Sequence, residues 1–385
     1  MAKLIGSAPN QISTNGDLGS MAFEDRTNYA TISSSIHQPY RNIIINGDMS
    51  IAQRATSAAS ISSGVVYHTV DRWITSASSA GTWTQSQSTD VPSGQGFAKS
   101  LKMDCTTANA SLSASSELLF QSRFEGQNLQ YLKKGTANAQ SLTLSFWVKS
   151  TKTGTFIAEL FDSDNTRQIS KSYTIDSAST WEKKTLTFSG DTTGAFGNDN
   201  ATSLSLNFWL SAGSNYTSGT LNTSWNSNTN ANRVVGQVNI ADSTSNDFYL
   251  TGVQLEAGTS ASDFEFLPVD VNLQRCFRYF YKWVSTNLYN NICMGTVAGA
   301  LLGRGVYAYP QIMRATPSLY ADGNFRVVGS SVVTLTGSGV TLNRANTNTV
   351  YIQMSGSGTN MTVRECCELG ANNDVDAEIT FSAEL

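Results

Sequence analysis

Two segments of the chain share the same alternation of apolar and polar residues. In Leu142–Val148 every second side chain is apolar, and the pattern returns in Leu204–Leu210 with the same Phe-Trp pair. Because successive side chains of a strand point to opposite faces, each segment predicts a strand with an apolar core face and a polar face. Each strand carries one tryptophan, Trp147 or Trp209, on its polar face.

Further segments of strand length surround these two. They are separated by clusters of Gly, Ser, Asn and Asp and by no helical pattern, which is typical of an antiparallel sandwich. A short strand that runs into a turn is also expected at Arg41–Asp48. The other predicted strands of this region are Thr155–Phe161, Ser172–Ile175, Lys183–Phe188 and Phe248–Glu256. The pattern therefore predicts an all-β fold.

The pattern also predicts the domain organisation. Residues 1–40 are polar and lack periodicity, which indicates an extended N-terminal arm. The sandwich is expected over 41–268, where Pro268 marks a boundary, and a second, smaller β domain over 269–385. This second domain begins with a short helical turn at Val271–Phe277, followed by an aromatic run through Trp283. We expect that run to form domain core and a subunit interface, with a sugar site as the alternative.

Composition and charge exclude some classes of protein and some partners. Charged residues make up 14% of the chain and hydrophobic residues 40%. This composition is too apolar for a disordered chain, and it is typical of strands with one solvent-exposed face. The net charge is −4, from 25 Lys and Arg against 29 Asp and Glu, with no basic block. Nucleic acid is not an expected partner, because phosphate binding needs a concentrated cationic patch.

No secretion signal is expected at the start of the chain, so the sequence favours a protein that is made and kept in a cytoplasm, or released only by lysis. The longest uncharged, fairly apolar stretch, Ile292–Gly303, is too short to span a membrane, and no membrane insertion is expected. The five cysteines are interpreted as free thiols. Cys366 and Cys367 lack the spacing of a zinc site, and the Asp162–Asn165 segment lacks that of a calcium loop. We predict no cofactor and no metal site.

Enzymatic motifs are absent from the sequence. The chain has two histidines, and it contains no HExxH, P-loop, GxSxG or GxGxxG pattern. The protein is therefore predicted not to be an enzyme. A pair of carboxylates at glycosidase distance stays open as the alternative, because Asp and Glu are plentiful.

Trp147 and Trp209 are the strongest candidates for ligand binding. An indole on the polar face of a strand can stack on the apolar face of a sugar ring, and by the alternation Tyr249 and Glu159 are expected on the same face. These four residues form the predicted glycan site. The competing interpretation, that both tryptophans pack beneath a loop, a second domain or another subunit, is favoured by the usual burial of large aromatic side chains.

Several short segments, in a consistent order, resemble those of tail-fibre and receptor-binding structural proteins of tailed bacteriophages, particularly phages of marine bacteria. The central domain also resembles jelly-roll carbohydrate-binding modules in its Phe-Trp-Val and Thr-Gly-Val-Gln-Leu-Glu strands. The segments that carry the phage resemblance are Ser13–Phe23, Asn46–Arg54, Asp71–Trp73, Leu250–Gly258, Leu273–Phe280, Met313–Pro317 and Ala383–Leu385.

The resemblance implies a virion component that mediates adhesion to a host. It implies a homotrimer, with the arm over residues 1–40 attached to other tail or virion proteins and the β domains facing a host surface polysaccharide or receptor. A carbohydrate-binding module of a degrading enzyme and a virion-bound depolymerase are the alternatives. The chain is short for a fibre and has no repetitive shaft, so the attachment point on tail, baseplate or head stays open.

Overall fold

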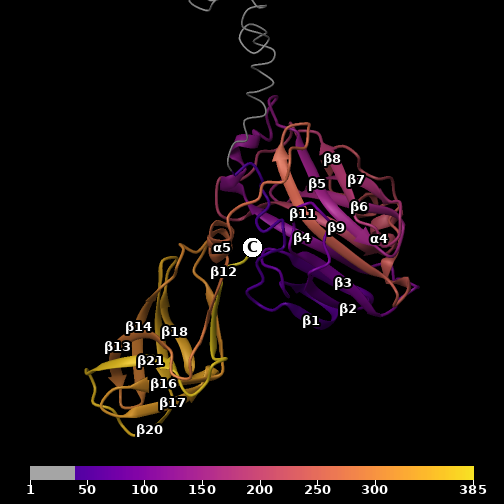
Figure 1. Ribbon diagram of the computed structural model, residues 1–385. Helices are drawn as coiled ribbons and strands as arrows, with labels where there is room; N and C mark the ends of the chain where they lie inside the picture. Colours follow the sequence, from indigo (N-terminus) through magenta and orange to yellow (C-terminus); the bar gives the residue numbers. More distant parts are fainter. Residues whose placement is uncertain (1–39) are drawn as a thin grey trace, which may run out of the picture. The chain divides into compact units, whose positions relative to one another are not determined.

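The computed structural model describes residues 40–385, and Asn42–Leu385 form one compact unit. Its first part is an antiparallel β-sandwich of jelly-roll type, in which eleven strands share one hydrogen-bonded network (Figure 1). The first layer contains, in order, β10 (Asn226–Ser227), β7 (Arg167–Ile175), β6 (Gly154–Asp162), β9 (Thr202–Ala212), β4 (Glu117–Glu125) and the first half of β2 (Ile74–Ser88). The second layer contains the second half of β2, β3 (Ser100–Thr107), β11 (Asp247–Ala257), β5 (Leu142–Ser150) and β8 (Glu182–Phe188). Strand β1 (Ser57–Val66) pairs with both halves of β2.

Strand β2 joins the two layers. Residues 74–78 pair with β4, and residues 82–88 pair with β3. Between these halves, Ser79 and Gly81 have positive φ angles of 50° and 81°. Glycine adopts this conformation without steric cost, and the strand continues through both residues, so one strand serves both layers.

The core lies between the layers, where the predicted apolar faces of the two tryptophan strands meet. The ring centroids of Phe146 in β5 and Phe208 in β9 are 5.0 Å apart, and those of Phe156 and Phe248 are 5.6 Å apart. All four residues are fully buried. The predicted strand alternation and the all-β class are therefore confirmed.

The second part of the unit begins with the helix α5 (Val269–Phe277), which confirms the predicted helical turn. A three-stranded sheet has the order β12-β22-β15, and an eight-stranded sheet has the order β18-β19-β14-β13-β21-β16-β17-β20. The strands are β12 (Phe280–Val284), β13 (Asn291–Gly299), β14 (Leu302–Ala308), β15 (Ser318–Asp322), β16 (Asn324–Val328), β17 (Val332–Thr336), β18 (Val340–Ala345), β19 (Thr349–Ser355), β20 (Ser357–Gly358), β21 (Cys366–Ala371) and β22 (Glu378–Ser382). Much of the aromatic run packs inside the chain, since Tyr279 and Phe280 are buried and Tyr281 stacks on Phe381 at 6.2 Å.

At Arg41–Asp48 the predicted turn is confirmed at Gly47 and Asp48, but the strand before it is wrong, because residues 42–46 form no strand and residues 44–46 make bends. The side chain of Asn42 accepts hydrogen bonds from the backbone of Ile44 and Leu255, both at 3.0 Å. Asn46 has a φ angle of 59°. Asparagine side chains that bond nearby backbone groups compete with strand pairing, which explains the turn. The predicted arm lies, except for residue 40, outside the described residues.

Candidate functional site

The four predicted site residues lie on two different outer faces of the sandwich. Trp147 of β5 and Tyr249 of β11 belong to the second layer, whose outer face they share. Trp209 of β9 and Glu159 of β6 lie on the outer face of the first layer. Four strands separate β9 from β5 in the hydrogen-bonded order. The two tryptophans therefore do not share one face, and the four predicted residues do not form a single glycan site.

Trp209 is fully buried in a polar cluster. Its indole N–H donates to Glu159 Oε2 at 3.0 Å, and Arg233 makes two hydrogen bonds to the same carboxylate at 2.7 and 2.8 Å. Glu159 has none of its surface exposed. Although burial lowers it, the nearby Glu159 raises the pKa of Arg233 above its usual value. A buried charge is tolerated when it is paired and hydrogen-bonded in this way, so Glu159 and Trp209 form a closed structural cluster.

A loop between β9 and β11 covers this cluster. The loop contains the short helix α4 (Ser214–Thr217), whose Tyr216 ring lies 5.3 Å from the ring of Trp209. Val234, from the same loop, is buried against Trp209. The interpretation that a tryptophan packs beneath a loop therefore holds for Trp209.

Trp147, by contrast, is partly exposed and lines a pocket of about 290 Å³. In the strand register it lies opposite Lys183 of β8 on one side and Thr251 of β11 on the other. Lys183 and Ser145 also line the pocket. Of the four predicted residues, Trp147 alone contributes to an open hollow of the sheet surface.

Three phenylalanines form the remaining aromatic wall of this pocket. Phe97 precedes β3, whereas Phe264 and Phe266 lie in the segment that follows β11. The ring centroids are 5.1 Å apart for Phe97–Phe264, 5.1 Å for Phe97–Phe266 and 4.9 Å for Phe264–Phe266. Phe97 is 9% exposed, but Phe266 is 51% exposed. The wall is thus a packed cluster with one ring open to solvent.

Gly252 allows Trp147 and this wall to approach each other. The pairing of β11 with β5 is interrupted between Thr251 and Gln254, and Gly252 there has a φ angle of 60°. A Cβ atom at this position would lie 2.6 Å from the Phe97 ring and 3.1 Å from Trp147. A bulge with a glycine at positive φ is therefore required by both the backbone and the side chains around it.

Tyr249 lies on β11 two residues before Thr251, the residue opposite Trp147, and most of its surface is covered. Its ring is 4.2 Å from the Lys149 ammonium and 6.1 Å from the Trp181 ring, and only 8% of the residue is exposed. The Trp181 indole donates to Asp90 at 2.9 Å, and Asp90 also pairs with Lys149. Burial is the main cause that raises the pKa of Tyr249. Tyr249 therefore supports the surface beside the pocket and is not among the residues that line it.

The phenylalanine wall was missed by the sequence analysis. These residues lie outside regular strands, so the alternation that indicates a strand face does not register them. The signal that could have found them is Phe264-Glu265-Phe266, two large aromatics in a polar connecting segment.

The Asp-rich turn at Asp162–Asn165 is occupied by a lysine. The Lys134 ammonium lies 2.5 Å from Asp162 and 3.0 Å from Asp191, and it donates to the carbonyls of Thr193 and Gly194. The two carboxylates are almost entirely buried. In the described part of the chain no group of three or more His, Cys, Asp or Glu could hold a metal ion. Across residues 40–385, each helix is too short or too polar to cross a membrane.

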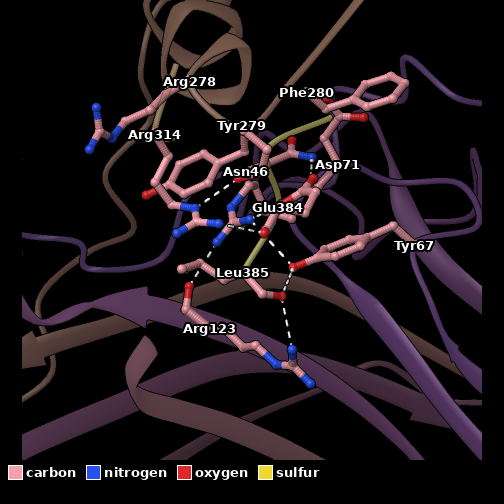
Figure 2. A network of polar contacts seen from close by, with 12 residues as sticks. Asn46, Tyr67, Asp71, Arg123, Arg278, Tyr279, Phe280, Arg314, Glu384 and Leu385 are labelled. Atoms are coloured by element: carbon pink, nitrogen blue, oxygen red, sulfur yellow. Dashed lines mark hydrogen bonds and ion pairs between the residues drawn. The ribbon is translucent and has the colours of Figure 1, made fainter. Parts of the chain in front are cut away.

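A second polar site lies where the sandwich meets the C-terminal β domain (Figure 2). The carboxylate of Glu384 pairs with Arg72 and, at 3.1 Å, with Arg54. The guanidinium of Arg72 lies 3.6 Å from the centroid of the Tyr279 ring, and that of Arg54 lies 3.6 Å from the centroid of Phe280. These contacts combine charge pairing with cation–π attraction in a buried setting.

Neighbouring residues complete this junction. Arg314 donates to the carbonyls of Ala383 and Glu384 at 2.7 and 2.8 Å, and Arg123 donates to that of Leu385 at 2.8 Å. Arg278 binds Glu125 through two hydrogen bonds. Segments Asp71–Trp73, Leu273–Phe280, Met313–Pro317 and Ala383–Leu385 all contribute residues. Most described segments that carry the phage resemblance therefore build the domain junction, and they do not form the pocket.

No protein-family model matches the chain, and no curated protein matches it. Similar solved structures include the enzymatically active domain of tailspike protein 4 of bacteriophage CBA120, at 15% identity and a TM-score of 0.31, over 57% of this chain and 22% of that one. The matched part of this chain thus spans about a fifth of the length of that domain.

Carbohydrate-binding modules are also among the similar structures. A CBM4 structure is 11% identical, with a TM-score of 0.29, over 55% of this chain and 97% of that one. A family 11 module from Clostridium thermocellum in complex with a mixed-linked tetrasaccharide is 12% identical, with a TM-score of 0.24, over 54% of this chain and 99% of that one. At these identities and TM-scores the likeness says nothing about what this chain binds.

Proposed function

We propose that the sandwich binds a glycan at the Trp147 pocket, and that the protein is a tail fibre that attaches a bacteriophage to a host surface polysaccharide. The observation that carries the binding proposal is the partly exposed indole of Trp147 in a pocket of about 290 Å³. Ligand pockets start at about 300 Å³. The hollow is thus suited to one or two sugar residues at the end or the side of a longer glycan.

The chemistry of the pocket supports this proposal. An indole offers an apolar face on which a sugar ring can stack, and stacking adds on the order of 1 kcal/mol beyond the buried area. The polar groups of the same hollow are a hydroxyl from Ser145, an ammonium from Lys183, an amide from Gln95 and a carboxylate from Asp263. Few polar groups beside an aromatic surface are the usual composition of a small-molecule site.

The experiment compares Trp147→Ala with Trp209→Ala in the full chain. Trp147→Ala should abolish binding to an array of bacterial surface polysaccharides and leave the melting temperature nearly unchanged. Trp209→Ala should lower the free energy of unfolding by about 3–5 kcal/mol, because it empties a packed site. Binding by Trp147→Ala that equals that of the natural chain would overturn the proposal.

The virion role is supported by the ordered sequence segments that resemble tail-fibre proteins. A homotrimer would carry three copies of a weak site and gain affinity through effective concentration. Light scattering of the purified chain should give three chain masses. A monomer at micromolar concentration would contradict the trimer. A chain that starts at Gln38 should fold but fail to enter particles, as expected for an attachment arm.

The proposed role is adhesion without catalysis. Two wholly buried carboxylates are held by arginine, Glu159 by Arg233 and Glu125 by Arg278. Hydrogen bonds from Arg278 and Tyr279 outweigh burial and lower the pKa of Glu125, so it remains an anion at neutral pH. A carboxyl group with a lowered pKa, such as that of Glu125, is a poor general acid, because a general acid needs a raised pKa. Incubation with a bound polysaccharide should release no new reducing ends, whereas their release would show a depolymerase.

A further inference from the structure

We infer that the Trp147 pocket selects a sugar residue that carries a methyl-terminated substituent, such as the acetamido group of an N-acetyl sugar or the methyl group of a 6-deoxy sugar. This inference rests on the proposed glycan binding and adds the class of sugar. The inference depends on the three phenylalanines of the pocket, because stacking of a sugar ring on Trp147 does not by itself require them.

The pocket is more aromatic than a stacking platform. Trp147, Phe97, Phe264 and Phe266 contribute four rings to a hollow of about 290 Å³. The three phenylalanine rings are in mutual contact at 4.9–5.1 Å, so they form one continuous apolar wall. The wall reaches Trp147 at Gly252, where the absence of a Cβ atom keeps both surfaces close.

An unsubstituted hexose fits such a wall poorly. One face of its ring is apolar and suits Trp147, but its edge carries hydroxyl groups that need hydrogen bonds. A hydroxyl pressed against phenylalanine rings loses its water and gains no partner, which is unfavourable. A methyl group in the same place exchanges apolar surface for apolar surface. In hydrophobic pockets one methyl group changes affinity on the order of tenfold.

The polar groups of the pocket give the sugar an orientation. Lys183 is opposite Trp147 in the pairing of β8 with β5, and Ser145 is two residues before Trp147, on the same face of β5. Hydroxyl groups can therefore face Lys183 and Ser145 while the substituent faces Phe266. Phe266 is the ring open to an incoming ligand, since it is 51% exposed.

The test measures binding of single sugars to the full chain by NMR titration. The probes are N-acetylglucosamine, 6-deoxyglucose and glucose, which separate the acetamido group, the 6-methyl group and neither. The variants are Phe266→Ala and, as the matched control, Tyr320→Ala, an aromatic on β15 that is 61% exposed. The natural chain should bind at least one substituted sugar about tenfold more tightly than glucose. Phe266→Ala should remove that preference, and Tyr320→Ala should keep it.

The outcomes separate this inference from the proposed function. Equal binding of glucose and both substituted sugars, or an equal loss for all sugars in Phe266→Ala, would overturn the selectivity and leave glycan binding intact. Binding to the polysaccharide array that survives Trp147→Ala would remove the site itself, and the inference with it. A preference for N-acetylglucosamine alone or for 6-deoxyglucose alone supports the inference and identifies the substituent.

Discussion

Substitution of Glu384 tests whether the junction between the sandwich and the C-terminal β domain stabilises the protein. Its carboxylate is 8% exposed and pairs with Arg72, whose side chain is 2% exposed. Glu384→Gln keeps the shape of the side chain but leaves the Arg72 guanidinium without its anion. Removal of one partner from a buried ion pair costs about 3–5 kcal/mol, because the remaining charge stays away from water.

The control is Glu378→Gln in β22. Glu378 pairs with Lys282, but their side chains are 26% and 17% exposed, so water already screens the pair. Such a pair contributes about 0–1 kcal/mol. The two variants make the same chemical change six residues apart and differ in burial.

Urea unfolding, followed by both circular dichroism and tryptophan fluorescence, measures these differences, and agreement of the two signals checks that unfolding is a single transition. Glu384→Gln should lower the free energy of unfolding by several kcal/mol more than Glu378→Gln. The double variant Arg72→Met/Glu384→Leu should recover most of the loss, since it removes both charges of the buried pair, and Arg54, the other partner of Glu384, still lies 3.8 Å from Asp71. Equal effects of the two single variants would refute the reasoning.

Two further predictions concern buried charges. Lys134→Met should lower the free energy of unfolding by about 3–5 kcal/mol, because Asp162 and Asp191 lose their shared cation. The control Lys152→Met, at a more exposed pair, should lower it by less than about 1 kcal/mol. Thermal or urea unfolding measures both variants, and similar losses would contradict the prediction. Burial raises the pKa of Asp71 from 3.8 to about 6, so the folded state holds the proton more tightly and this residue's contribution to stability falls by about 2 kcal/mol as pH rises from 4 to 6. The difference in unfolding free energy between the natural chain and Asp71→Asn should decline over that range, and a flat difference would exclude the raised pKa.

The sequence predicted the strands well because their signal is local. Alternation in Leu142–Val148 and Leu204–Leu210 depends only on the period of a strand, and it correctly assigned Phe146 and Phe208 to the core. The same signal failed at residues 42–48. There the β-branched run Ile43–Ile45 favours a strand, but the side chain of Asn42 bonds the backbone and holds a turn.

The candidate site was predicted only in part. Alternation placed Trp147 and Trp209 on polar faces of their strands, and both do point away from the core. It carried no information on what covers each face. The loop with Tyr216 and Val234 closes over Trp209, whereas Phe97 and Phe266 leave a hollow at Trp147. These contacts join residues far apart in the chain, which no local pattern records.

By itself, the sequence determined the all-β class, the strands with one apolar face and the short helix α5, because each depends on neighbours within a few residues. Tertiary structure decided which tryptophan is accessible, which rings line the pocket, and that segments as distant as Asp71–Trp73 and Ala383–Leu385 meet at one junction. The physical reason is that burial and charge pairing depend on chain segments brought together by folding. A residue's own pattern sets the face it occupies, and the rest of the chain sets whether that face meets water, a loop or a partner charge.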